Sequence, residues 1–278
     1  MIEFIKAIII GIVQGITEWI PVSSTGHMIL FEQFLKFNLS DAFIEIFNVV
    51  IQLGSILAVV VLYFSRLNPF SRKKTYAKRI QTWNLWFKIA IACIPPAIIG
   101  LLLDDWFDEH FYNFIVVSIA LIVYGIAFII IEKINKNKTP RINDVNAVDC
   151  KTALGIGVFQ LLAFIPGTSR SGSTIIGGII FGVSRTAASE FSFFLAIPIM
   201  LGASFLKLLK YFLEGNAMFT GQEWGILITG CVVAFIVSLF AIKVLINYVR
   251  RHTFSAFGVY RIILGIVVLG TWILRTLI

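Results

Sequence analysis

Long apolar runs, separated by short polar segments, make up most of the chain. The longer runs have about 20 residues or more, the length at which an α-helix crosses the hydrocarbon core of a bilayer. They lie at residues 43–65, 83–103, 112–132, 187–213, 224–246 and 257–277. The pattern therefore predicts an all-α polytopic membrane protein with six transmembrane helices.

Two further apolar segments are interrupted near their middle. Residues 2–37 are broken at Pro21-Val22-Ser23-Ser24, and residues 152–182 are broken around Pro166. Apolar pieces of about 10–14 residues are too short to span and are often re-entrant. Irregular backbone at membrane depth is tolerated only inside the protein or beside a water-filled cavity. We therefore expect two re-entrant helix–loop–helix hairpins.

The two interruptions follow one plan. A Gly-x-x-Gln ending at Gln14 or Gln160 is followed by apolar residues, Ile-Pro and a Ser/Thr/Gly cluster, and the match needs a one-residue gap. We interpret the chain as a single membrane domain, residues 1–278, built from repeat one (1–135) and repeat two (150–278). Three predicted spans separate the hairpins, so the hairpins should enter from opposite faces. Inverted-topology repeats of this kind place their site near the midplane, where the broken helices meet.

Composition supports the membrane interpretation. The chain is 58% hydrophobic and only 14% charged, with a mean hydropathy of +0.92, whereas soluble domains are about a quarter charged. A soluble protein of this size could not bury that much apolar surface.

The net charge of +8 is unevenly distributed. Basic loops follow the first, third and fifth predicted spans, and acidic or weakly charged loops follow the second and fourth. This alternation predicts that the basic loops face the cytoplasm and that both termini lie outside. A nucleic-acid partner is not expected, because no polar segment interleaves basic residues with stacking aromatics.

The first interruption carries an amide and an acid on one helix face. Gln14 and Glu18 are four residues apart and so point the same way. They are either a polar pair facing a water-filled entrance or groups aimed at a substrate or metal ion. We favour the second interpretation, because ionisable groups at membrane depth are costly and usually functional.

Hydroxyl groups and a histidine follow. One hydroxyl of Ser23, Ser24 and Thr25 could cap the next helix, which leaves the others available to a substrate. Ser24 and His27 are three residues apart, and a serine next to a histidine is a nucleophile pattern. The alternative for His27 is a buried structural histidine, and the proximity of Glu18 favours catalysis.

The second interruption is typical of an anion-binding loop. Small residues let backbone N–H groups approach a ligand, and the next helix offers its positive N-terminal end. Arg170 adds a fork-shaped cation that suits phosphate oxygens, unless it only neutralises Glu18 or Glu190. The candidate substrate-binding residues here are Gly167, Thr168, Ser169, Ser171 and Thr174. Together the two motifs predict one composite site, with acid and base from the first half and cation from the second.

The sequence also resembles a known family. The segments QGITEWIPVSSTGH (14–27) and PGTSRSGST (166–174) resemble the two signatures of the bacitracin-resistance type undecaprenyl-diphosphatases. VIQLGS (50–55) and AASEFSF (187–193) are also similar, and the resemblance covers essentially the whole chain.

The resemblance implies a phosphatase of the bacterial cell membrane that hydrolyses undecaprenyl diphosphate to the monophosphate and so recycles a lipid carrier for the cell wall. It implies catalytic roles for Glu18, Ser24, His27 and Arg170, and a divalent cation, Mg²⁺ or Ca²⁺. Gln14 stands where other versions have an acid, so Glu18 is the expected metal ligand and Gln14 a substrate-binding residue. The nucleophile stays open between Ser24, His27 and water.

The expected partners are a polyprenyl diphosphate lipid and membrane lipids, and a homodimer stays open. The alternative function is a secondary transporter or flippase of an anionic lipid or small anion, because inverted repeats with broken helices are typical of transporters.

Overall fold

The computed structural model describes residues 1–35, 37–214 and 218–277, and within these residues the regular structure is helical. Two 3₁₀ turns, Val145–Ala147 and Leu161–Phe164, and an isolated bridge between Ile142 and Val183 complete it. The helices are α1 (Ile2–Thr17), α2 (Ser24–Phe34), α3 (Asp41–Leu62), α4 (Phe64–Leu67), α5 (Tyr76–Phe111), α6 (Phe114–Asn135), α7 (Cys150–Gln160), α8 (Arg170–Ile180), α9 (Arg185–Leu213), α10 (Gly221–Val249) and α11 (Ser255–Leu277).

Among the described residues, six helices are long and apolar enough to cross a membrane: α3, α5, α6, α9, α10 and α11. The prediction of a polytopic all-α membrane protein is therefore confirmed at this level. The largest difference is in α5, which runs from Tyr76 to Phe111 rather than over residues 83–103. Its first turns are polar and basic, so hydropathy alone did not reveal them.

The short helix α1 also has an apolar surface on its exposed side. On α1, Ile5, Ile8, Ile12 and Ile16 form an exposed stripe, whereas Ile10 on the opposite face is buried. An exposed stripe with helical spacing is the surface that lipid would cover.

Helices approach one another closely at glycines. A Cβ added to Gly54 of α3 would lie 2.2 Å from the carbonyl oxygen of Cys231 on α10, and one added to Gly157 of α7 would lie 2.3 Å from that of Ala92 on α5. Gly11 of α1 meets Gly230 of α10 in the same way. Small residues at such crossings let membrane helices pack backbone to backbone.

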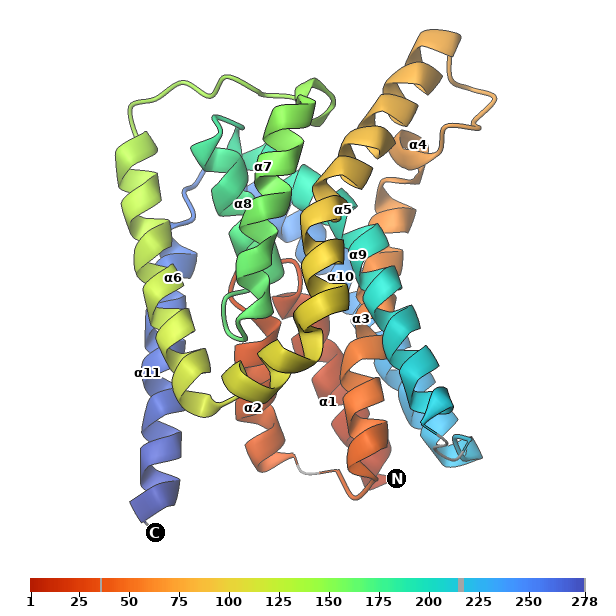
Figure 1. Ribbon diagram of the computed structural model, residues 1–278, viewed down its shortest axis with the longest axis vertical. Coiled ribbons are helices and arrows are strands. Elements are labelled where there is room, and N and C mark those ends of the chain that lie inside the picture. The colour runs from red at the N-terminus through yellow and green to blue at the C-terminus, as the bar shows by residue number, and fades with distance from the viewer. Residues whose placement is uncertain (36, 215–217, 278) are drawn as a thin grey trace.

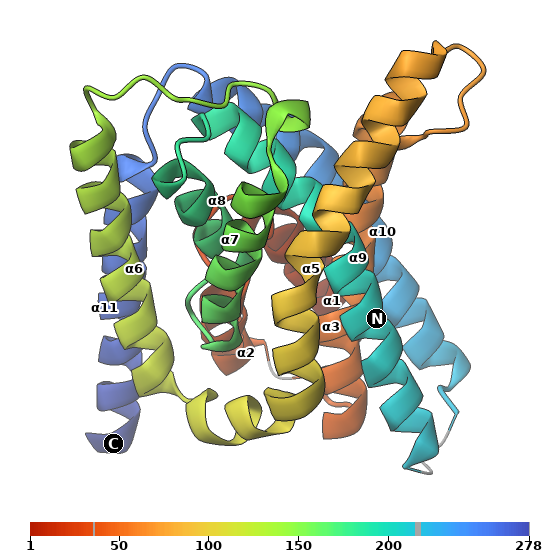
Figure 2. The same cartoon turned by 45° about the horizontal axis from the view of Figure 1, so that its top comes forward.

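The two interrupted segments occupy different ends of the bundle. In Figure 1, α1 and α2 lie in the lower part and α7 and α8 in the upper part, and both termini lie towards the lower end. The connections after α3, α6 and α10 are at the top, and those after α5 and α9 are at the bottom. Figures 1 and 2 both show α7 and α8 between the α6–α11 pair and α5. The loop turns of the two segments thus meet inside the bundle.

Candidate functional site

The two loop turns have the same backbone geometry. Ser23 and Ser169 both adopt positive φ, 71° and 76°. Each caps its following helix by accepting a hydrogen bond from the glycine three residues on: Gly26 N at 3.3 Å and Gly172 N at 3.1 Å. Ser23 is therefore the predicted capping hydroxyl.

The first motif has one residue more than the second between its glutamine and its Ile-Pro pair, and the second has one residue more between its proline and its capping serine. Gly167 adopts φ 92° in this longer stretch of the second loop. Gly167 suits that position, because glycine adopts positive φ without cost and a Cβ would lie 2.6 Å from the carbonyl oxygen of Val117. With Ser23 and Ser169 aligned, Ser24 and Arg170 become equivalent: each is the first residue of its helix.

Both equivalent residues reach the same carboxylate. Arg170 Nη2 donates to Glu18 Oε1 at 2.9 Å, and Ser24 Oγ donates to Glu18 Oε2 at 3.3 Å. Gln14 Nε2 also donates to Oε2, at 2.9 Å. Glu18 is 6% exposed, so the Glu18–Arg170 ion pair is buried. The structure thus brings the two motifs together.

Further contacts fix the position of Arg170. Its Nη1 donates to the backbone oxygen of Ser192 at 2.8 Å, and its guanidinium lies 5.7 Å from the ring centre of Trp19. Thr174 Oγ1 donates to Ser192 Oγ at 2.7 Å, and Ser171 Oγ donates to the backbone oxygen of Glu18 at 3.1 Å. Ser171 and Thr174, predicted to bind substrate, therefore help to hold the frame of the site. Ser192 was missed, although it lies in the AASEFSF segment.

Glu190, the other acid that was considered as a partner of Arg170, pairs elsewhere. Glu190 Oε1 accepts a hydrogen bond from Arg66 Nη1 at 2.7 Å. Of the two acids that Arg170 was expected to neutralise, the structure pairs it with Glu18.

His27 has partners at both ring nitrogens. Nδ1 lies 2.7 Å from the backbone oxygen of Ser23, and Nε2 lies 2.7 Å from the hydroxyl of Tyr260, whose ring stacks on the imidazole. A carbonyl only accepts, so Nδ1 carries a proton, and the tyrosine hydroxyl can either donate to Nε2 or accept from it. The expected Ser24–His27 pair is not formed: within the described residues Ser24 bonds to Glu18 and His27 to Ser23 and Tyr260.

A buried arginine that sequence reasoning missed connects the two loops. Arg261 of α11 is 0% exposed. Its Nη2 donates to the backbone oxygens of Gly167 and Thr168, both at 2.8 Å, and its Nη1 donates to that of Pro21 at 3.3 Å. The available signal was an arginine within the apolar run 257–277, since charges inside spans are rarely idle.

A cavity of about 510 Å³ opens beside the site. Gln14, Ser24 and Thr25 line one wall. The rest of the wall is mostly polar and comes from α3 and its surroundings: Asp41, Glu45, Asn48, Gln52, Tyr112 and Lys207. Met28, Ile44 and Val49 add an apolar part. The cavity gives a polar substrate group access to Ser24.

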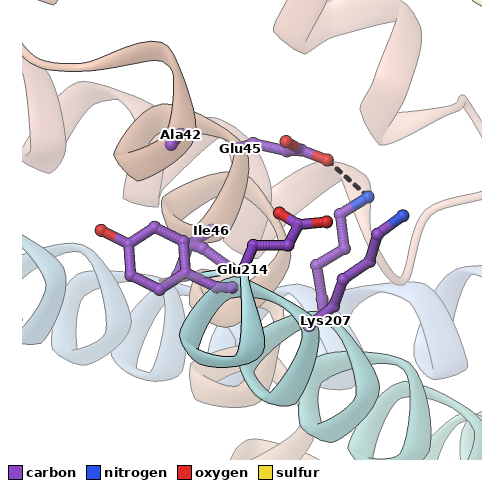
Figure 3. A pocket seen from close by; sticks show the side chains of 7 residues that line it. Ala42, Glu45, Ile46, Lys207 and Glu214 are labelled. Carbon is purple, nitrogen blue, oxygen red and sulfur yellow. Dashed lines mark ion pairs between the residues drawn. The ribbon is translucent and has the colours of Figure 1, made fainter. Parts of the chain in front are cut away.

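A smaller pocket of about 130 Å³ adjoins this cavity between α3 and α9, sharing Glu45 and Lys207 with it. Figure 3 shows these two side chains forming an ion pair, with Glu214 nearby. This pair and the Glu190–Arg66 pair both connect α9 with α3 or its continuation.

Few side chains near the site could bind the divalent cation that the resemblance implies. The described residues contain no group of three or more His, Cys, Asp or Glu side chains that could hold a metal ion. Mg²⁺ commonly binds through one or two carboxylates plus substrate phosphates and water. Glu18, with Gln14 and Ser24 beside it, fits an ion that is held mainly by a substrate diphosphate.

The sequence was compared with known proteins. The family described as "Bacitracin resistance protein BacA" matches residues 7–267. A curated protein of Enterococcus faecalis, named undecaprenyl-diphosphatase, is 59% identical over 268 residues, which cover 96% of this chain and 97% of that protein. Proteins with the same name from Streptococcus thermophilus (57% identical, 97% of this chain and 93% of that protein) and Desulfitobacterium hafniense (55% identical, 100% and 99%) also match. This chain therefore belongs to the BacA bacitracin resistance family.

Proposed function

We propose that this protein hydrolyses undecaprenyl diphosphate to undecaprenyl phosphate and inorganic phosphate, and so recycles a lipid carrier of cell-wall synthesis in the bacterial cell membrane. Its relatives at 53–59% identity carry the name of this enzyme. The observation that carries the proposal is the contact of Arg170 with Glu18 across 152 residues of sequence, because it joins an anion-binding cation to the acid and serine of the other motif.

The diphosphate would be bound chiefly by the second motif. Arginine matches phosphate oxygens with two parallel hydrogen bonds, and α8 directs its N-terminal N–H groups towards its first residue, Arg170. Phosphoryl transfer depends mainly on positioning and on stabilising charge on the phosphate oxygens. The polyprenyl tail would remain in the lipid between spans.

Ser24 is our proposed nucleophile, because its hydroxyl already donates to Glu18. Ser24 Oγ attacks the terminal phosphorus, its proton passes to Glu18, and the bond from that phosphorus to the bridging oxygen breaks. Undecaprenyl phosphate then leaves. Water next attacks the phosphorus of the phosphoserine, the bond from that phosphorus to Ser24 Oγ breaks, and phosphate leaves with both protons of the water, while Glu18 returns its proton to Ser24 Oγ. Phosphoserine at position 24 in acid-quenched enzyme would support this step, whereas turnover by Ser24→Ala would contradict it.

Glu18, with Gln14 and Ser24 nearby, would hold the divalent cation together with diphosphate oxygens. When bound, Mg²⁺ or Ca²⁺ would neutralise negative charge that develops on those oxygens. Glu18 therefore has two proposed duties, towards the cation and towards Ser24.

The arrangement of the chain in the membrane is part of the proposal. We infer that α1–α2 and α7–α8 are re-entrant hairpins of an inverted repeat, entering from opposite faces, with the basic loops cytoplasmic and both termini outside. The matched φ values of Ser23 and Ser169, the matched close approaches of Gly11 and Gly157, and the opposite placement of the hairpins in Figure 1 support this. Because the site lies within one chain, the reaction does not depend on a homodimer.

The test is phosphate release from C55 diphosphate by the purified protein in detergent, with and without a chelator. We expect release that stops when the chelator is added and resumes with Mg²⁺ or Ca²⁺. Movement of the lipid across vesicles without phosphate release would instead favour the transporter or flippase.

A further inference from the structure

Arg261 is a cation in an apolar setting. It is fully buried, and its guanidinium lies 5.7 Å from the ring centre of Tyr124 and 6.0 Å from that of Phe128. The ion pairs among the described residues do not include it. A buried charge without a charged partner is costly, so it needs compensation from elsewhere.

The backbone of the two loops provides part of that compensation. Arg261 donates to Pro21 of the first loop and to Gly167 and Thr168 of the second. A guanidinium can do this because it presents five N–H groups in a rigid plane, whereas a lysine ammonium is a flexible point donor. Arg261 thus holds the two loop turns in one fixed relation.

These hydrogen bonds also orient the peptide groups. In a trans peptide the C=O and the N–H point in opposite directions. Because the carbonyl of Thr168 points at Arg261, the N–H of Ser169 points away from it. An anion on the far side of the second loop therefore meets N–H rather than C=O.

The charge balance of the site adds a second argument. At rest Arg170 is paired with Glu18, so these two charges cancel. Arg261 bonds to the backbone oxygen of Thr168, two residues before Arg170. Its charge gives the site a net positive charge, which suits a diphosphate.

We propose that Arg261 is a positioning residue for the reaction: it supplies the uncompensated positive charge of the anion site and holds the two loops in register. The inference rests on the proposed function and concerns the headgroup part of the same substrate. Arg261 should therefore have two separable effects. Its charge should affect the affinity for the anion, and its planar guanidinium, which holds the two loops, should affect kcat.

The experiment compares Arg261→Lys and Arg261→Gln in the full-length protein. Binding of inorganic pyrophosphate is measured by titration calorimetry, and kcat and KM are measured with C55 diphosphate. We expect Arg261→Gln to weaken pyrophosphate binding by about tenfold or more, equivalent to about 1.4 kcal/mol. Arg261→Lys keeps the charge, so its pyrophosphate affinity should stay within about threefold of wild type while kcat falls by about tenfold or more.

Arg185→Gln is the matched control. Arg185 also contacts a deeply buried partner on another helix, Glu132 of α6, but it lies outside the two loops. Its loss should lower the melting temperature but leave pyrophosphate affinity unchanged. If Arg261→Gln folds and binds pyrophosphate like wild type, the charge role is overturned. If Arg261→Gln does not fold, Arg261→Lys decides: an unchanged kcat overturns the positioning role, and a reduced kcat with retained affinity supports it.

The binding arm is independent of catalysis. A wild-type protein that binds pyrophosphate in an Arg261-dependent way but releases no phosphate would sink the proposed function and leave this inference standing. A wild-type protein that releases phosphate but responds to neither substitution would do the reverse.

Discussion

Glu18 accepts hydrogen bonds from three side chains that come from both motifs: Gln14, Ser24 and Arg170. Each of its carboxylate oxygens is therefore already in use. Removing the negative charge would leave Arg170 buried without its partner, which typically costs several kcal/mol in such pairs.

We therefore expect Glu18→Gln to reduce phosphate release by about two orders of magnitude or more, because the variant loses both the ion pair and the base for Ser24. Glu190→Gln is the control, since it also breaks a Glu–Arg ion pair, that with the partly exposed Arg66. Rates measured with C55 diphosphate should separate the two, and equal losses in both variants would argue that only folding is affected.

Tyr260 holds the imidazole of His27 through one hydrogen bond with Nε2. Tyr260→Phe keeps the stacked ring and removes the hydroxyl. A hydrogen bond of this kind is worth about 1 kcal/mol, so phosphate release should fall about fivefold. Tyr248→Phe, in the other stacked Tyr–His pair with His252, should have no effect on the rate. A Tyr260→Phe enzyme with wild-type kcat would show that the hydroxyl is not used.

The sequence predicted which residues of the two motifs lie in the site, but not which of them form hydrogen bonds with one another. Spacing suggested that Ser24 pairs with His27, yet the left-handed turn at Ser23 directs them to different partners. Tyr260 and Arg261 lie more than 200 residues from the first loop, so no local pattern could connect them with it. The capping serine and the meeting of Arg170 with Glu18 were predictable, because each follows from a motif.

At the scale of helices, the long apolar runs predicted the ends of the spans to within a few residues, except at both ends of α5. Their packing partners could not be predicted, because these depend on close backbone contacts. Gly54 is the tightest case: its α-carbon hydrogens face the carbonyl group of Cys231.

We expect Gly54→Ala to push α3 away from α10 and destabilise the fold by about 1–3 kcal/mol, the usual cost of overpacking. Gly202→Ala in α9 is the matched control, because nothing lies within 4 Å of its added Cβ. A glycine-to-alanine change in a helix otherwise gains up to about 1 kcal/mol. Thermal unfolding in detergent should show opposite or unequal shifts, and equal shifts would contradict the close α3–α10 contact.

At the scale of the whole molecule, the basic connections lie at one end and the acidic or weakly charged connections at the other. The basic connections after α3, α6 and α10 lie at one end of Figure 1. The positive-inside rule predicts that the end with the basic connections faces the cytoplasm.

Cys150 offers a direct test of this orientation, because it is exposed at the start of α7, at the basic end. In a Cys93→Ser/Cys231→Ser background, an impermeant maleimide should label it in inside-out vesicles and not in intact cells. Gly221→Cys with Cys150→Ser, at the opposite end, should give the reverse pattern. Labelling of Cys150 in intact cells would invert the proposed topology.

The equivalence of Ser24 and Arg170, each first in its helix and each bound to Glu18, limits how such a catalyst can be assembled. Two identical copies of the first half, docked as a symmetric dimer, would bring together two serines and two carboxylates with no guanidinium. Two copies of the second half would present two guanidinium groups and no acid at the place of Glu18. The tandem chain lets the two halves carry different side chains at matching places, and so supplies the nucleophile and the cation to a single shared acid.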